Sequence, residues 1–440
     1  LADRQFMSIA LLVAPLLAVI LGYFSKYVSG DGSDPHRYLF SQNDNLPAYL
    51  FMSVVVALFL VLIVAAEEII KDRRIQERES FLQLSRNSYL LSKITLLFIL
   101  SAIQMGLFVL IGNFIMEIRG LTLSYWLVLF STACFANLLG LNISDGLKSV
   151  VAIYVIVPFL LVPQILLAGV IVKFDKLHYR FVTHEMVPLA GDLMASRWAY
   201  EALAVNQFVN NTYQKELFEL EMHESNVTYD MQFLVPTLIQ ELEDLLDQAG
   251  SGSTEPFPED RLSTVKDGLS SIFLTTSYPR IDQLNAEQFT PALASDIIAW
   301  LRKYQSALQS HREKLVLRRD ARIDSLQFAA GGTEPYLRIK RNHHNEQLAD
   351  LLLNRNELHK IVKREGKLVR KMEPVYMYPL RSNGRSHFYA SFKKVRDLYI
   401  PAISFNLMAI WMMTLILYLT LLFGLLRKIL VFFGQLRRRR

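Results

Sequence analysis

A long run of charged residues in the sequence is EEIIKDRRIQERESF, which covers residues 67–81. It follows directly on an apolar stretch and mixes carboxylates with lysine and arginine. A helix that carries both signs can form charge-assisted contacts with a partner, and such contacts can differ between two rigid-body arrangements. The more common interpretation of such a run is a solvated charged face at a membrane boundary.

Other groups of polar residues offer little catalytic or metal chemistry. His343 and His344 lie near Glu346, but consecutive helix residues point about 100° apart and no fourth ligand is suggested. A solvated helix face is therefore favoured, and we predict no metal site. The polar residues that an integral-membrane enzyme could use are few and scattered: Asp145, His184 and Glu185.

The sequence contains no phosphate-binding loop of the glycine-rich type that ends in Lys-Ser or Lys-Thr. We therefore expect no catalytic site and no cofactor in this chain, and any energy for work must come from elsewhere.

The composition is that of a membrane protein. Of the 440 residues, 52% are hydrophobic, and they come in long blocks. The net charge is only +6 and the cations cluster beside apolar blocks, which disfavours a nucleic-acid partner. Cys134 is the single cysteine, so an intrachain disulfide is excluded. The chain begins with Leu1, and no cleavage site follows the first apolar block, so we interpret the start as a truncation.

Six stretches are long and apolar enough to cross the hydrocarbon core as helices. They cover approximately residues 6–24, 48–66, 89–115, 123–142, 150–172 and 399–426. The predicted fold is thus an all-α integral membrane protein with six transmembrane helices. Residues 1–172 would hold the first five helices, and residues 398–440 the sixth helix and a basic tail.

Lysine and arginine near the ends of spans indicate the cytoplasmic side. The loop after the second span and the tail after the sixth are rich in these cations, which are Lys71, Arg73, Arg74, Arg78, Arg86, Lys93, Arg427, Lys428 and Arg437 to Arg440. Both regions are therefore predicted to be cytoplasmic. Alternation places both termini in the cytoplasm and the long segment after span five outside.

Residues 173–397 form a polar block between the last two spans, and apolar residues recur in it at helical spacing. The first such series is Leu234, Leu238, Leu242 and Leu245; the second is Ile297, Leu301, Tyr304, Leu308 and Leu315; the third is Leu348, Leu351, Leu358, Ile361 and Leu368. Gly331–Pro335 separates the last two series, which predicts an antiparallel helical hairpin in a mainly helical extracytoplasmic domain.

Residues 67–94 resemble the first intracellular loop of the membrane domain of G-subfamily (White-type) ABC exporters, especially the bacterial members. The matching positions are Glu67 and Glu68, Asp72-Arg73-Arg74, Arg78-Glu79, and Tyr89 to Lys93. Further matches cover the first span, a turn between spans four and five, the fifth span and a signature beyond it, at residues 14–22, 140–144, 157–171 and 196–203. The resemblance covers about residues 1–210 and 398–426. The outer segment is longer than the family's loop and lacks its cysteines, and the ATPase domain that usually precedes the spans is missing.

The resemblance implies that this chain forms one half of the membrane part of a transporter. It would pair with a second half, most simply as a homodimer, and with an ATPase domain that binds ATP and Mg²⁺. The loop 67–93 would pass ATPase closure to the spans, and the residues assigned to this coupling are Glu67, Glu68, Asp72, Arg73, Arg78 and Glu79. The resemblance also implies a cavity between spans two and five, closed outward by a valve after Ala168-Gly169. The wall candidates are Leu60, Leu161 and Ile165, and the valve candidates are Val170 and Ile171. From hydrophobicity alone, lipid-facing or packing residues are the more common interpretation.

The predicted function is therefore the permease half of an ATP-driven exporter in the cell (inner) membrane. An apolar wall without a buried charge favours an amphipathic or lipid-like substrate over an ion. The alternative is a mechanotransmitter, whose outer helical domain acts on an envelope protein while nothing crosses the membrane. A channel is disfavoured because the spans carry no ring of charges.

Overall fold

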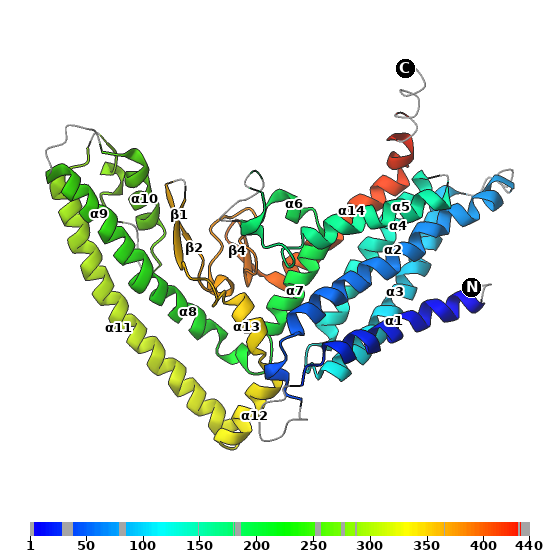
Figure 1. The fold of residues 1–440 in the computed structure, drawn as a ribbon, viewed down its shortest axis with the longest axis horizontal. Coiled ribbons are helices and arrows are strands. Elements are labelled where there is room, and N and C mark those ends of the chain that lie inside the picture. Colours follow the sequence, from blue (N-terminus) through cyan, green and yellow to red (C-terminus); the bar gives the residue numbers. More distant parts are fainter. Residues whose placement is uncertain are drawn as a thin grey trace. The chain divides into compact units, whose positions relative to one another are not determined.

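The computed structural model describes residues 4–28, 38–78, 85–147, 149–178, 180, 186–250, 257–273, 278–286, 288–364, 366–429 and 432. Most of these residues are helical, as predicted (Figure 1). The chain divides into two compact units. The membrane unit consists of Leu1–Thr212, Lys340–Leu348 and Pro379–Arg440, and the insert unit of Tyr213–Ile339 and Ala349–Tyr378. The predicted outer segment 173–397 is thus shared between the two.

The membrane unit contains the apolar helices. Its helices are α1 (Arg4–Ser25), α2 (Leu46–Arg78), α3 (Arg86–Met116), α4 (Thr122–Gly146), α5 (Val150–Leu166), α6 (Leu189–Asp192), α7 (Ala195–Val209) and α14 (Ala402–Leu422). Four of them are long and apolar enough to cross a membrane, over Leu46–Arg73, Arg86–Met116, Thr122–Gly146 and Ala402–Leu422. The apolar stretches Leu11–Ser25 and Val150–Leu166 are shorter. The number of six spans therefore stays a prediction.

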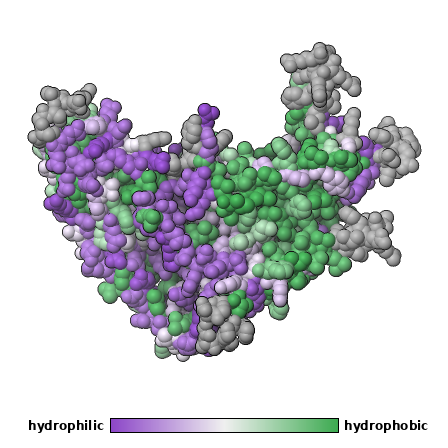
Figure 2. Space-filling model, viewed as in Figure 1, coloured by the Kyte–Doolittle hydropathy of each residue, from purple (hydrophilic) through white to green (hydrophobic). Residues whose placement is uncertain are grey.

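Hydrophobic side chains gather on the surface of these helices, whereas the surface of the insert unit is mainly hydrophilic (Figure 2). Phe114 of α3 and Phe159 of α5 are among the most exposed large apolar side chains in the described chain. Exposed apolar surface of this extent is unusual for a soluble protein and suits contact with lipid.

The fifth apolar segment is shorter than the predicted 150–172. Helix α5 contains Pro158 and Pro163 and ends at Leu166, and residues 167–172 form turns. Gly169 lies in this turn region with φ +79°, a conformation that disfavours residues with a Cβ. Pro163 lacks an N–H and interrupts the helical ladder, which favours an early end of the helix.

Helices α2 and α4 approach each other closely through small residues. A Cβ on Gly140 of α4 would lie 2.8 Å from the Cβ of Ala65 and 2.9 Å from the carbonyl oxygen of Leu62. One turn further along α4, the Ser144 hydroxyl accepts hydrogen bonds from the backbone N–H groups of Ile69 and Ile70. Residues spaced as small-xxx-small allow such backbone contact in membrane helices. The prediction of a turn at 140–144 was therefore wrong, because this segment is the packed last part of α4.

The insert unit is built on long helices. It contains α8 (Phe218–Tyr229), α9 (Val235–Gly250), α10 (Glu259–Ser270), α11 (Pro291–Ala329), and the strands β1 (Ile361–Arg364) and β2 (Lys367–Arg370), which pair antiparallel. A π-helical turn, Asp230–Leu234, joins α8 to α9, and α11 packs against both. The first two predicted apolar series are confirmed as core residues of this unit.

The prediction that the third apolar series forms one helix of a hairpin was wrong. Helices α12 (Thr333–His343) and α13 (Glu346–Leu352) follow the turn at Gly331, but Leu358 lies beyond α13 and is almost fully exposed. Ile361 and Leu368 lie on β1 and β2 instead. A series of apolar residues at steps of three and seven does not distinguish a short helix followed by a hairpin from one long helix.

A second antiparallel pair, β3 (Phe392–Val395) and β4 (Leu398–Pro401), belongs to the membrane unit and leads directly into α14. Tyr399, the predicted first residue of the sixth span, lies on β4 rather than on a helix. The fold is thus mostly helical but not all-α.

Candidate functional site

Charged side chains join α2 to α3 at the end of α2 that carries the predicted coupling residues. Lys93 Nζ lies 2.8 Å from Glu68 Oε2 and 2.8 Å from Asp72 Oδ2. The hydroxyl of Tyr89 donates to the same Asp72 oxygen at 3.0 Å. The two acids are four residues apart on α2, and Tyr89 and Lys93 are four apart on α3, so each pair lies on one helix face.

The start of α3 places these side chains. Ser85 is the N-cap of α3, and its hydroxyl accepts from the backbone N–H of Ser88. This cap satisfies one of the free N–H groups of the first helical turn. The helix therefore begins so that Arg86, Tyr89 and Lys93 lie in its first two turns.

Arg86 extends the network to two further helices. Its guanidinium donates to Asp145 Oδ2 at 3.2 Å, at the end of α4, and to the carbonyl oxygen of Leu421 at 3.3 Å, at the end of α14. Arg73 of α2 donates to the carbonyl oxygen of Asp145 at 3.2 Å. A carbonyl at a helix C-terminus carries partial negative charge, so a cation stabilises it.

Glu67 connects the network to α5. Its carboxylate pairs with Lys71 on the same helix and accepts a hydrogen bond from the Tyr154 hydroxyl of α5. Together with the contacts above, one end of α2 is linked to α3, α4 and α5, and Arg86 adds α14. These residues lie at the end of α2 that the sequence predicts to be cytoplasmic, and we therefore call them the inner-end network: Glu67, Glu68, Lys71, Asp72, Arg73, Arg86, Tyr89, Lys93, Asp145 and Tyr154.

Of the six predicted coupling residues, Glu67, Glu68, Asp72 and Arg73 lie in this network. Arg78 is the last residue of α2, and its side chain lies outside the described part of the chain, as does Glu79. The sequence did not predict Asp145 or Tyr154 as coupling residues. The i, i+4 spacing of Tyr89 and Lys93, opposite the same spacing of the two acids, is a signal that predicts partners across the loop.

The network is suited to mechanical linkage rather than to catalysis. The Lys93, Glu68 and Asp72 side chains are between 17% and 29% exposed, so their ion pairs are partly shielded from water. Partly buried ion pairs that join separate helices can be exchanged when the helices move as rigid bodies. In the described residues, no group of three or more His, Cys, Asp or Glu side chains could hold a metal ion.

The predicted cavity and valve residues lie on α2, on α5 and in the turn region after α5. Leu60 of α2 and Leu161 of α5 are buried, and Ile165 is partly exposed near the end of α5. Val170 and Ile171 follow α5 in the turn region after Gly169, and Ile171 is 59% exposed. Their positions leave the proposed valve role a prediction.

A separate groove lies between α1 and α3, with a volume of about 650 Å³. Its walls are mainly leucine and isoleucine, with three hydroxyl groups on α3, and the lining residues are Leu11, Ser88, Leu91, Ser92, Thr95, Leu96, Ile99, Leu100 and Ile103. The hydroxyls lie toward the start of α3, the end at which the charged network lies. The groove therefore combines a long apolar wall with polar groups at one end.

In a comparison with known protein families, residues 3–208 match the model of the ABC-2 type transporter membrane domain. The matched region contains α1–α5 and most of α7, and so includes every residue of the inner-end network. No curated protein and no solved structure matched the chain in the corresponding comparisons.

Proposed function

We propose that this chain, whose residues 3–208 form an ABC-2 type transporter membrane domain, is the permease half of an ATP-driven exporter of amphipathic or lipid-like molecules. The membrane domain makes it the permease component of an ABC transporter, which works with an ATPase component. We further propose that transport is outward, that the substrate is amphipathic or lipid-like, and that the chain is closely related to the G-subfamily. A homodimer in the cell (inner) membrane with cytoplasmic termini belongs to the same proposal.

The inner-end network is the observation that carries this proposal. An ATPase on the cytoplasmic side can move the spans only if force applied at one place reaches several helices. Glu68 and Asp72 of α2 share Lys93 of α3, and Arg86 reaches α4 and α14. Closure of the ATPase against the segment 67–93 would therefore displace these helices together.

The proposed substrate class is supported by the nature of the apolar surfaces. The groove between α1 and α3 offers leucine and isoleucine side chains along its length and hydroxyls at one end. This combination suits a molecule with an acyl chain and a polar head better than it suits an ion, whose path usually contains ionisable groups.

The test is the ATPase activity of the full transporter, comprising this chain and its ATPase, in lipid nanodiscs. We expect stimulation by one class of a panel of lipids, lipopeptides and hydrophobic drugs, and transport of that class in vesicles. Activity that is indifferent to every amphipathic molecule, with no transport in vesicles, would contradict the exporter proposal.

The size and packing of the insert unit favour a second candidate, the mechanotransmitter. Its helices α8, α9 and α11 bury a core of their own, so the unit can transmit a displacement without deforming. In this case we expect ATPase activity to respond to an envelope protein while small molecules have no effect.

A further inference from the structure

Two opposite charges are completely buried in the membrane unit, outside the candidate spans. Glu201 of α7 and Lys393 of β3 are both 0% exposed, and Lys393 Nζ lies 2.8 Å from Glu201 Oε1. Burial opposes the ionisation of Glu201, but Arg197 and Lys393 lower its pKa below the ordinary value, and burial lowers the pKa of Lys393 to about 8. The nearby cations and the hydrogen bonds keep the carboxylate charged in a place where an isolated charge would be strongly disfavoured.

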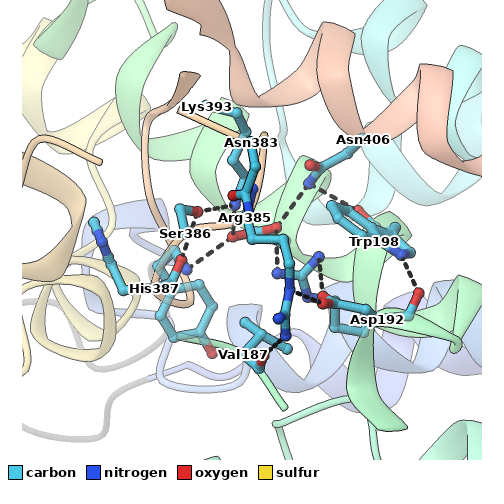
Figure 3. Close-up of polar contacts among 12 residues, drawn as sticks. Val187, Asp192, Trp198, Asn383, Arg385, Ser386, His387, Lys393 and Asn406 are labelled. Carbon is cyan, nitrogen blue, oxygen red and sulfur yellow. Dashed lines mark hydrogen bonds and ion pairs between the residues drawn. The ribbon is translucent and has the colours of Figure 1, made fainter. Parts of the chain in front are cut away.

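The Glu201 carboxylate contacts pieces of chain that are far apart in the sequence. Figure 3 shows Lys393, Asn406 and Trp198 within this group of polar contacts. The carboxylate accepts hydrogen bonds from Lys393 Nζ, from the backbone N–H of Tyr389 at 3.0 Å, and from Asn406 Nδ2 of α14 at 3.0 Å. The same Asn406 amide also donates to the carbonyl oxygen of Trp198, on α7. One carboxylate on α7 therefore fixes the segment before α14 and the first turns of α14 itself.

A second ion pair holds the same segment. Arg385 Nε lies 2.9 Å from Asp192 Oδ2, and Arg385 Nη2 donates to the carbonyl oxygen of Val187 at 2.8 Å. Lys393 Nζ also donates to the Ser386 hydroxyl at 2.7 Å. We call this group the Glu201 clasp: Asp192, Arg197, Glu201, Arg385, Ser386, Tyr389, Lys393 and Asn406.

The charges of the clasp are not balanced. Three cations, on Arg197, Arg385 and Lys393, lie near two carboxylates, on Asp192 and Glu201. Apolar residues of similar volume would hold two segments together at least as well as a buried ion pair does, so stability alone does not explain this one. Directional contacts between charged groups do, however, fix one relative position of the segments.

The clasp lies close to the places where the chain leaves the membrane unit and returns to it. Helix α7 leads from the membrane unit into the insert unit at Tyr213, and the chain returns from the insert unit at Tyr378. Glu201 lies on the outgoing chain, and Lys393 lies on the returning chain just before α14. The clasp thus holds the outgoing segment, which contains α7, against the returning segment, which leads into α14.

We propose that the Glu201–Lys393 pair is a transmission joint, which makes α7, the β3–β4 hairpin and α14 move as one body and so passes motion of the membrane helices to the insert unit. The inference rests on the proposed ATP-driven function. Glu201 and Lys393 are positioning residues in it, since they act through the elements that they hold.

The joint can be tested by distance measurements between spin labels in the full transporter. Cys134→Ala removes the single cysteine of this chain, and the ATPase is used in a cysteine-free form. Labels are placed at Leu317→Cys on the insert unit and at Arg119→Cys on the membrane unit, both exposed positions. We expect the distance distribution to change when ATP and vanadate are added. Lys393→Met, which leaves Arg197 near Glu201, should reduce this change about fivefold or more.

Lys394→Met is the matched control, because Lys394 neighbours Lys393 but is partly exposed, and it should retain the full change. A Glu201→Gln/Lys393→Met double variant keeps an oxygen acceptor at position 201 and removes both charges of the pair, while Arg197 keeps Asp192 as its partner. It should behave as Lys393→Met does. If both clasp variants keep the wild-type change in label distance on addition of ATP and vanadate, the proposed joint is wrong. A protein that shows the change but transports nothing would instead refute the exporter function and leave the joint in place.

The unmodified protein supplies a further readout that does not depend on how the variants fold. The Tyr389 amide donates to Glu201, so its hydrogen exchange should be slow both with and without ATP and vanadate. Rapid exchange of this amide in either state would show that the clasp opens, and would contradict the inference.

Discussion

Lys93 occupies the centre of the inner-end network, where it neutralises two carboxylates from another helix. Glu68 and Asp72 lie four residues apart on α2, and without Lys93 they would face each other as like charges. The sequence identified both acids as coupling residues, because they fall at positions that resemble a known intracellular loop. The spacing of Tyr89 and Lys93 indicates partners across the loop, but the sharing of one lysine by both acids depends on how α2 and α3 are packed.

A buried carboxyl group in the insert unit provides a test at the scale of one residue. Asp230, in the π-helical turn, accepts from the Phe273 N–H and the Tyr304 hydroxyl, each at 2.9 Å. Burial raises its pKa to about 6. The folded unit therefore binds this proton more tightly than the unfolded chain does. Its stabilising contribution is complete below about pH 4 and is lost as the pH rises through about 6.

Asp230→Asn should accordingly stabilise the insert unit at pH 7 by about 1–3 kcal/mol, with no gain near pH 4. The amide oxygen can still accept both hydrogen bonds, while the charge is removed. Trp300 stacks on Tyr304 at 5.6 Å, so thermal unfolding can be followed by its fluorescence, with a Trp300→Phe protein as the blank. Asp296→Asn, an exposed control, should change little. Equal stability of Asp230→Asn and wild type at pH 7 would refute this account of Asp230.

At the scale of elements, the positions of the long apolar helices were largely predictable. Helices α2, α3, α4 and α14 each contain most of a predicted span, because a run of about 20 apolar residues has few alternatives to a helix in lipid. The ends were less predictable. The end of α5 at Leu166 depends on two prolines and on Gly169, and Tyr399 became part of a strand through its pairing with Lys394.

The predicted helical hairpin was wrong because its structure, like the ends of the helices, depends on tertiary contacts. Leu358, Ile361 and Leu368 continue an apolar series that helices and short strands can both produce. Which structure forms depends on contacts that are distant in sequence, such as the one between Gly366 and Ser263 of α10. The site was predictable only where local spacing was enough: the acids of α2 were found, whereas Asp145 and Tyr154 come from helices that only tertiary packing brings near.

The close contact between α2 and α4 predicts a clear difference between two glycines. A methyl group at Gly140 would lie within 2.9 Å of backbone atoms of α2, whereas at Gly106 of α3 it would meet only the Trp126 ring, at 3.6 Å. Gly140→Ala should destabilise the protein by about 1–3 kcal/mol, because helices packed this tightly must separate. Gly106→Ala should be neutral or slightly stabilising, since alanine favours helices. Thermal unfolding in detergent measures both, and equal midpoints for the two variants would contradict the packing described here.

At the scale of the whole molecule, the chain passes between the membrane unit and the insert unit at four places. The residues of the Glu201 clasp lie before the first and after the last of these crossings. The other two flank residues 340–348, where Asn345 Nδ2 donates to the carbonyl oxygens of Phe40 at 2.8 Å and Asn43 at 2.9 Å, just before α2. The chain segments that lead into and out of the insert unit thus include α7 and the segment before α14, and residues 340–348 between them contact the segment before α2. Helices α2 and α14 are also joined through Asp145 of α4 and Arg86 of α3.

This connectivity gives the two polar groups complementary roles in our account. The inner-end network would receive motion from an ATPase, and the Glu201 clasp would deliver it to the insert unit. The proposed exporter and the mechanotransmitter both need the first step, and they differ in what the motion accomplishes.

The most direct test of this central claim is the number of substrate molecules transported per ATP hydrolysed by Lys93→Met in the full transporter. Lys93→Met removes both ion pairs at once, Lys93→Arg keeps the charge, and Lys428→Met is a matched control at an exposed lysine that follows α14. We predict near-normal ATP hydrolysis by Lys93→Met, a transport-to-hydrolysis ratio lowered about tenfold, and normal ratios for Lys93→Arg and Lys428→Met. A wild-type ratio in a folded Lys93→Met protein would contradict the claim that the inner-end network transmits the force of ATP hydrolysis to the membrane helices.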